Sequence, residues 1–212
     1  MAHRVLFVCE ANVCRSPLMA FTFLRRAPQV SDGWVVTSAG TDARERDGRM
    51  CEVSAGLLQG ADGAREYVHA HRTTPLTQER VSEQTMIIVA GMAERAAVAR
   101  LDPRMRERTF TLRECVFLAR EPVTWAEISA TADASAVDSF DNFPLILNRR
   151  RGVVTLPRAR PRWGWRAAVD DPLTVPDAHQ LKHRMHVSTL RSMTGDVAEV
   201  CSHISRYMSM RE

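Results

Sequence analysis

Short apolar runs alternate with stretches of helical composition along the first 120 residues. Each run is bounded by polar or turn-forming residues, as in strands that are buried on both faces of a parallel sheet. Strands are expected at 4–9, 34–38, 86–90 and, more weakly, 109–112. Helices are expected at 17–26, 50–59 and 93–101 and near residue 114, with prolines at 28 and 103 ending two of them. This alternation predicts an α/β fold, a four-stranded parallel sheet with helices on both faces.

The pattern loosens after about residue 120. Residues 120–166 contain an Ala/Ser-rich stretch and an Arg-loaded tract, and their apolar content is too thin for an independent core. We therefore interpret 1–212 as a single domain with an irregular insertion at about 120–166. In the tail, apolar residues recur at helical spacing and predict a mostly helical segment over 177–207. They are Leu190, Met193, Val197, Val200, Ile204 and Met208.

Composition narrows the class of protein. The chain is 45% hydrophobic and 25% charged, with a formal net charge of +4. No apolar stretch reaches the roughly 20 residues of a membrane span, and the mild charge balance does not indicate a nucleic-acid binder. The apolar run at the N-terminus is too short for a secretory signal. Five scattered cysteines argue against a disulfide framework, so we expect a reducing, cytoplasmic location.

The segment VCEANVCRSP at 8–17 carries the candidate chemistry. Cys9 ends the first strand, Arg15 follows after five residues, and Ser16 and Pro17 are expected to cap and open a helix. The helix N-terminus and the amides of the short loop would converge into an anion nest. Arg15 adds a planar fork for phosphoryl oxygens, and the nest favours the thiolate form of Cys9, a nucleophile.

This segment resembles the phosphate loop, with its CX5R pattern, of the low-molecular-weight protein tyrosine phosphatases, which share their fold with one class of arsenate reductases. Other segments resemble the family in register: SAGT at 38–41, AHR with PLT over 70–77, MIIVAGM at 86–92, FTLRE at 110–114 and VDDP at 169–172. The resemblance covers 4 to about 120 and resumes at 169. It therefore places the insertion directly before the Asp-Pro loop.

The resemblance implies a two-step hydrolysis. Cys9 would attack phosphorus to form a phosphocysteine, while Arg15 and the loop amides hold the oxygens. Ser16 would donate to the thiolate, and Asp171, which directly precedes the proline, would act as general acid and then general base. The phosphate-binding loop would comprise Glu10, Ala11, Asn12, Val13, Cys14 and Arg15. Asn12, Ser38 and His71 would form its hydrogen-bonded scaffold. The substrate would be a phosphorylated protein or a small aryl phosphate, and the chemistry needs no metal or cofactor.

The sequence departs from the family at the pocket mouth. Residues 41–50 contain no aromatic side chain, although phosphotyrosine-specific members have them there. The carboxylate that usually follows the third strand is replaced near Gly91. We hypothesise that Trp163 and Trp165, in the insertion, restore an aromatic rim.

Two interpretations of Cys14 remain open: a disulfide with Cys9 that protects the nucleophile, or a side chain packed under the loop. The three other cysteines are expected to be core or interface thiols. They are Cys51, Cys115 and Cys201.

Three histidines recur at i, i+4 and i+7 in the tail: His179, His183 and His186. Imidazoles one helical turn apart can share a metal ion. No carboxylate or cysteine completes the set, so a solvated helix face is the expected interpretation.

Two other functions compete with the phosphatase. An arsenate reductase that uses an external thiol would need only Cys9, whereas the thioredoxin-coupled branch relays oxidation through cysteines after the third strand, and 91–101 contains none. A non-catalytic phosphate-binding module would not need the combination of Cys9, Arg15 and Asp171.

Overall fold

The computed structural model describes residues 2–28, 33–43, 48–131, 140–158, 171–179 and 182–210. Within them lies one parallel sheet in the order β2-β1-β3-β4. Its strands are β1 (His3–Cys9), β2 (Trp34–Gly40), β3 (Met86–Val89) and β4 (Thr109–Thr111). The expected four-stranded parallel sheet is confirmed.

The strand order indicates a binding position at the carboxyl end of β1. The chain passes from β1 to β2 on one side, and β3 then pairs with the other side of β1. In open α/β sheets, ligands bind outside the carboxyl ends of the strands at such a reversal. Cys9, the last residue of β1, is paired with Gly40 at the same edge. The fold thus places the VCEANVCRSP segment at the expected binding position.

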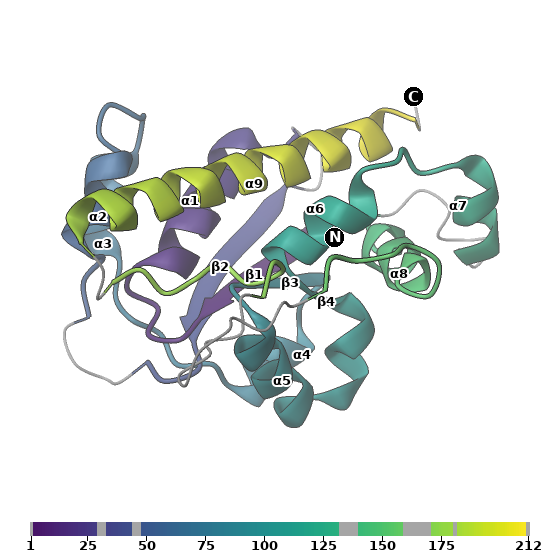
Figure 1. The fold of residues 1–212 in the computed structure, drawn as a ribbon, viewed down its shortest axis with the longest axis horizontal. Coiled ribbons are helices and arrows are strands. Elements are labelled where there is room, and N and C mark those ends of the chain that lie inside the picture. The colour runs from purple at the N-terminus through teal and green to yellow at the C-terminus, as the bar shows by residue number, and fades with distance from the viewer. Residues whose placement is uncertain are drawn as a thin grey trace.

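Helices cover both faces of the sheet (Figure 1). On one side lie α1 (Arg15–Arg26), α6 (Leu112–Ala119) and α9 (His183–Ser209). On the other lie α4 (Gln78–Ser82), α5 (Met92–Leu101) and the 3-10 helix η1 (Pro103–Arg108). A hydrophobic core lies on each face of the sheet, and alternate residues of β1 enter them. Val5 and Phe7 pack in the core under α1 and α9, and Leu6 and Val8 pack in the core under α4 and α5. The period-2 geometry of a strand explains why its whole sequence is apolar.

Two short helices, α2 (Glu52–Leu57) and α3 (Ala64–Ala70), follow β2. The long helix α9 packs on α1, α6 and α2. Its apolar stripe is buried as the helical spacing predicts, through Leu190, Met193, Val197, Val200 and Ile204. Among the described helices, none is both long enough and apolar enough to cross a membrane.

The inserted segment carries two helices, α7 (Trp125–Thr131) and α8 (Asn142–Arg150), where irregular structure was expected. Its apolar side chains are few, but Phe140, Phe143 and Leu147 are completely buried in the same core as α9. The Arg150 guanidinium hydrogen-bonds Glu127 at 2.6 Å and lowers the pKa of that carboxyl to about 2. Arg150, from the Arg-loaded tract, therefore ties α8 to α7.

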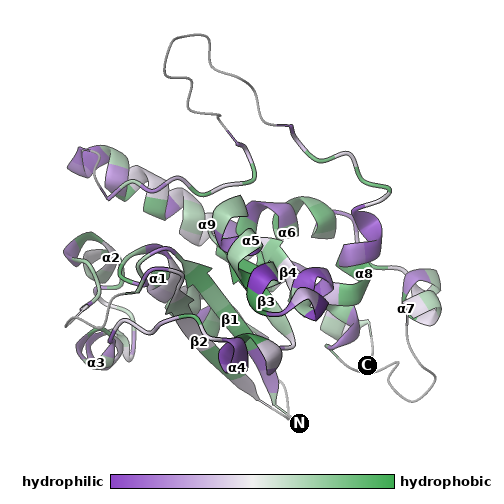
Figure 2. Ribbon diagram, turned by 90° about the horizontal axis from the view of Figure 1, so that it is seen from below, coloured by the Kyte–Doolittle hydropathy of each residue, from purple (hydrophilic) through white to green (hydrophobic). Residues whose placement is uncertain are grey.

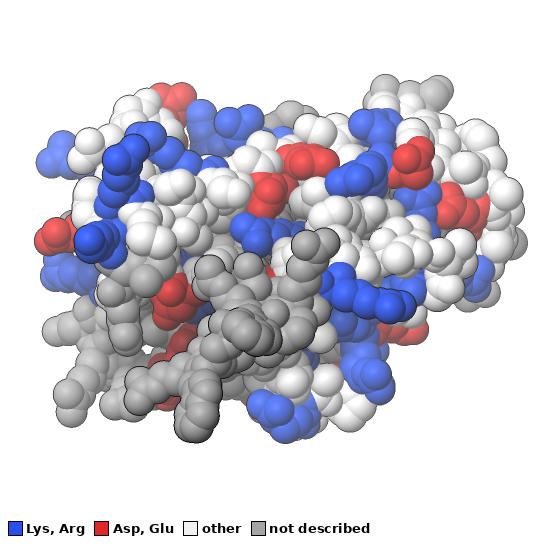
Figure 3. Space-filling model, in the orientation of Figure 1, with Lys and Arg blue, Asp and Glu red and all other residues white. Residues whose placement is uncertain are grey.

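Polar residues lie outward and apolar residues lie along the sheet (Figure 2). Basic and acidic side chains are interspersed on the face seen in Figure 3, as the small net charge leads one to expect.

Candidate active site

The loop from Cys9 to Arg15 joins β1 directly to α1. It passes close to the end of β2, where the amide of Thr41 donates to Cys9 O at 3.0 Å. Gly40 makes this approach possible, because a Cβ there would lie 2.6 Å from Glu10 O. Asn12 has a φ of 55°, the left-handed conformation that asparagine tolerates better than most residues. These two residues shape the tight turn over the strand edge.

Cys9 and Ser16 face each other inside this loop. Cys9 Sγ lies 3.0 Å from Ser16 Oγ, and both residues are buried. The expectation that Ser16 caps the helix is wrong, because α1 begins at Arg15 with Cys14 as its N-cap residue and no side-chain cap bond. The hydroxyl instead contacts the candidate nucleophile, and it can also donate to Ala39 O at 3.3 Å. The hydroxyl thus contacts the sulfur, as the resemblance implied, and does not cap the helix.

Asn12 links the loop to its surroundings. Its Nδ2 donates to Ser16 Oγ and Ser38 Oγ, each at 2.9 Å. Its Oδ1 accepts from the Thr74 amide at 2.8 Å, and its carbonyl oxygen lies 2.8 Å from His71 Nε2. Burial lowers the pKa of His71, which favours a neutral ring that donates to that carbonyl. The structure brings together all three residues that the resemblance assigned to a scaffold.

Arg15 is buried and already partnered. Its Nη1 donates to Val175 O at 3.1 Å and lies 3.9 Å from a carboxylate oxygen of Glu94, which is also buried. Its Nη2 lies 3.5 Å from Asp177, whose side chain is about half exposed. The backbone contact and the buried Glu94 hold the guanidinium on one side, and Asp177 occupies the more open side.

Glu94 is a site residue that the sequence analysis missed. A carboxylate was sought beside Gly91, whereas Glu94 lies in the first turn of α5. Gly91 is instead the point where the Thr174 side chain approaches the backbone closely, since a Cβ there would lie 2.7 Å from that side chain. The available signal was a glutamate one turn into the helix, where its side chain can point back toward the preceding loop.

Asp171 lies in the segment that follows the insertion. Its carboxylate accepts from the Leu173 amide at 3.0 Å and the Thr174 hydroxyl at 2.6 Å. The segment is attached to the sheet edge, because the Val175 amide donates to Ala90 O at 2.8 Å. Together with the bond from Arg15 to Val175, this places the Asp-Pro segment beside the phosphate loop. Asp170, Trp163 and Trp165 lie outside the described residues. The hypothesis of an aromatic rim therefore stays a prediction.

The side chain of Cys14 contacts groups other than Cys9. Its Sγ lies 3.3 Å from Cys51 Sγ, 3.0 Å from His186 Nε2 and 3.1 Å from Ser54 Oγ. A hydrogen bond with the Cys14 thiol is the main cause that lowers the pKa of Cys51 to about 5, and hydrogen bonds from Ser54 lower it further. The same contact raises the pKa of Cys14. All five cysteines are free. Cys51 is therefore not a simple core thiol.

The remaining cysteines are buried away from these groups. Burial raises the pKa of the Cys201 thiol to about 12, and it also raises that of Cys115. Both have the character of unreactive core thiols.

The three tail histidines do not share one solvated face. His183 is exposed on α9, whereas His186 is buried with 4% of its surface exposed. His179 precedes α9, and its ring lies 5.5 Å from that of His186. Within the described residues, His179, His186, Cys14 and Cys51 form a group with the donor types of a metal site.

Comparisons with known proteins agree on one family. The family model described as low molecular weight phosphotyrosine protein phosphatase matches residues 4–123. A protein-arginine-phosphatase of Geobacillus stearothermophilus is 30% identical over 116 residues, which cover 55% of this chain and 73% of that protein.

Solved structures share the fold. A low molecular weight protein tyrosine phosphatase from T. tengcongensis superposes with a TM-score of 0.59 at 17% identity, covering 95% of this chain and 99% of that one. A mutant YwlE arginine phosphatase with a phosphorylated active-site serine superposes with a TM-score of 0.58 at 16% identity, covering 95% of each chain.

Proposed function

Because the chain belongs to the low molecular weight phosphotyrosine protein phosphatase family, we propose that it hydrolyses phosphorylated protein side chains through a phosphocysteine on Cys9. One observation carries the proposal. Cys9 Sγ lies 3.0 Å from the Ser16 hydroxyl at the start of the 12-residue helix α1, with the guanidinium of Arg15 buried in the same loop. A sulfur nucleophile and the groups that bind phosphoryl oxygens thus occupy one site.

In the first step, the amides of residues 10–15 and the Arg15 guanidinium bind the phosphoryl oxygens. The thiolate of Cys9 forms a bond to phosphorus as the bond to the leaving group breaks, and Asp171 gives that group a proton. Arg15 exchanges its contact with Asp177 for the substrate, while Glu94 and the Val175 carbonyl keep it oriented.

In the second step, a water attacks phosphorus and Asp171 accepts its proton. The sulfur–phosphorus bond breaks, and the Ser16 hydroxyl stabilises the departing thiolate of Cys9. A covalent intermediate is supported by the mutant YwlE arginine phosphatase, in which an active-site serine is phosphorylated. A reducing cytoplasmic compartment is part of the proposal, since an oxidised Cys9 could not attack phosphorus.

The first substrate to consider is phosphotyrosine, after which the family is named. Phosphoarginine is a second candidate, favoured by the arginine-phosphatase relative and by acidic side chains near the loop. Glu10 and Asp42 are exposed, and the Asp42 amide donates to Glu10 O at 2.9 Å. Exposed carboxylates beside the loop would attract a guanidinium, whereas a phenyl ring binds better against aromatic walls. Both substrates transfer the same phosphoryl group and differ in the leaving atom, oxygen or nitrogen.

The test compares the wild type with Cys9→Ser and Asp171→Asn on three substrates: a phosphotyrosine peptide, a phosphoarginine peptide, and arsenate with a low-molecular-weight thiol. We expect hydrolysis of one or both peptides, its loss in Cys9→Ser, and a fall on the order of 10²-fold or more in Asp171→Asn. Full hydrolysis by Cys9→Ser contradicts the nucleophile, and arsenate reduction without peptide hydrolysis contradicts the phosphatase.

A further inference from the structure

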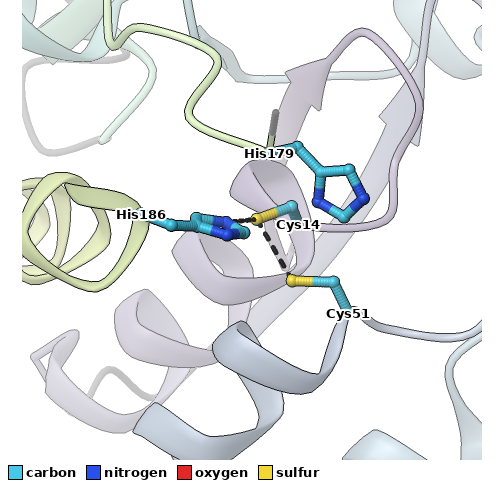
Figure 4. A group of neighbouring side chains, drawn as sticks. All are labelled: Cys14, Cys51, His179 and His186. Carbon is cyan, nitrogen blue, oxygen red and sulfur yellow. Dashed lines mark hydrogen bonds between the residues drawn. The ribbon is translucent and has the colours of Figure 1, made fainter. Parts of the chain in front are cut away.

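Four side chains from distant parts of the chain meet behind the phosphate loop (Figure 4). Cys14 comes from the end of that loop, Cys51 from the start of α2, and His186 from the first turn of α9. His179 comes from the segment between the Asp-Pro turn and α9. Their ligand atoms all lie within 4.8 Å of one another. From these residues, we propose that the protein binds a structural Zn²⁺ ion.

The donor set is the first argument. Two sulfurs and two imidazole nitrogens in a tetrahedral arrangement are a common structural zinc site, and soft thiolates select Zn²⁺ over hard cations. Two thiolates also balance the charge of a divalent ion. The four residues fill all four positions of a tetrahedron, so the site is closed and has no place for a catalytic water.

The distances are the second argument. Zinc–sulfur bonds of about 2.3 Å and zinc–nitrogen bonds of about 2.0–2.1 Å give a tetrahedron with edges of about 3.3 to 3.8 Å. Cys14 Sγ lies 3.3 Å from Cys51 Sγ and 3.0 Å from His186 Nε2. These contacts and the outer limit of 4.8 Å bracket the required edges. The separations of the four donors thus lie around the edge lengths that one zinc ion requires.

The surroundings of the sulfurs are the third argument. Ser54 Oγ lies 3.1 Å from Cys14 Sγ and 3.2 Å from Cys51 Sγ, and the Ser54 amide donates to Cys51 Sγ at 3.4 Å. The Cys51 amide donates to Val13 O at 2.9 Å, which attaches this ligand to the phosphate loop. Hydroxyl and amide groups beside metal-bound sulfurs orient them, as ligand-supporting groups do in known metal sites.

The positions of the three tail histidines favour a metal site over a solvated helix face. His183 lies on α9 only three positions before His186, yet it is exposed and outside the cluster. His179 is exposed too, but its ring lies edge-on to that of His186, with the ring centroids 5.5 Å apart and the planes at 81°. His179 and His183 are thus both exposed, but of these two only His179 lies beside the sulfurs of Cys14 and Cys51.

An ion at this position would link the phosphate loop, the start of α2, the segment that carries Asp177, and α9. His179 follows Asp177, the partner of Arg15, by two residues. The ion would thus hold the segment that carries Asp171 and Asp177 against the phosphate loop. This consequence for catalysis rests on the proposed function, whereas metal binding itself does not.

The test measures metal rather than turnover. The full chain, purified with a non-thiol reductant and equilibrated with Zn²⁺, is desalted and analysed for bound zinc. We expect about one equivalent per chain. Replacement by Co²⁺ should give the thiolate-to-cobalt charge-transfer band and the intense visible absorption of a tetrahedral site. Reduced wild-type protein that retains no zinc and gives no such cobalt spectrum would overturn the proposal.

Matched variants identify the ligands. His179→Ala and Cys51→Ser should lose the zinc, while His183→Ala, at the neighbouring exposed histidine, and Cys201→Ser, at a buried thiol elsewhere, should keep it. The metal-free wild type should also unfold at a lower temperature than the zinc-bound form, and His179→Ala should show no difference between the two conditions. Equal zinc retention by His179→Ala and His183→Ala contradicts the assignment, whether or not the protein hydrolyses a phosphopeptide.

Discussion

The guanidinium of Arg15 lies 3.5 Å from the carboxylate of Asp177, so an acidic side chain occupies the open side of the arginine that we propose to bind phosphate. The two residues are brought together by the bond from Arg15 to Val175 O, two positions before Asp177. A phosphoryl group must displace this carboxylate or accept its repulsion. The ligand-free site is thus partly neutralised by the protein itself, which limits the electrostatic cost of burying Arg15.

Asp177→Asn should strengthen binding of inorganic phosphate. Removing the competing charge should lower the inhibition constant of phosphate by about 1.5- to 5-fold, because a partly exposed ion pair contributes only ~0.2–1 kcal/mol. Inhibition of phosphopeptide hydrolysis measures this constant. Asp62→Asn, at an exposed carboxylate that pairs with Arg25, is the control and should leave the constant unchanged. A weaker inhibition in Asp177→Asn would contradict the competition.

Ser16→Ala should slow the release of the phosphoryl group from the enzyme. The hydroxyl lies 3.0 Å from Cys9 Sγ, and a hydrogen bond to a charged group is worth ~1.5–3 kcal/mol, so turnover should fall on the order of 10- to 100-fold. Rapid-quench kinetics should show a burst of leaving group followed by a slow steady rate.

Ser38→Ala is the matched control for that experiment. Ser38 also accepts from Asn12 Nδ2 at 2.9 Å but has no contact with Cys9 among those described. It should weaken the scaffold without producing a burst. A burst of equal size in both variants would assign the effect to the loop's shape rather than to the thiolate.

Asn12→Ala should destabilise the fold more than Asn12→Gly does. Both variants remove the buried side-chain bonds of Asn12 to Ser16, Ser38 and Thr74, at a cost of about 2–4 kcal/mol. Alanine must in addition adopt a φ of 55°, which costs an L-residue with a Cβ about 1–2 kcal/mol more than glycine. Urea unfolding measures the difference, and equal stability of the two variants would show that the backbone strain is not retained.

Stability should decline as the pH falls through the ordinary range of histidine. Burial lowers the pKa of His71 from 6.5, so the folded protein favours the neutral ring that donates to Asn12 O. Its contribution is present above pH 6.5 and is lost as the pH falls from there toward the lowered folded-state pKa, because the unfolded chain binds the proton first.

His71→Gln keeps an N–H donor but does not titrate. The unfolding temperature of the wild type relative to this variant should therefore fall between about pH 7.5 and about pH 5.5. Other ionisable groups, including His203, are present in both proteins and cancel in the comparison. A difference that stays constant over this range would show that His71 is not protonated on unfolding there.

The sequence indicated the sheet and the loop but misplaced individual roles. Ser16 was expected both to cap the helix and, from the resemblance, to donate to Cys9, and the structure has the contact with Cys9 without the cap. Glu94 was missed because the search was tied to the position of Gly91, although a helix brings a residue one turn away to the same place. The insertion was interpreted as irregular because its apolar residues are sparse. Phe140 and Phe143 are buried and attach α8 to the existing core, and Arg150 ties α8 to α7.

What the sequence alone determined are the features that depend on neighbours along the chain: strand periodicity, the alternation of strands and helices, and the short segment that joins β1 to α1. Only the tertiary structure decided which distant side chains meet. Cys14 and His186 are 172 positions apart, and their contact exists because α9 packs on α1 and α2. A search along the chain for a partner to the histidines could not find the cysteines, since proximity in a folded protein is set by packing and not by spacing.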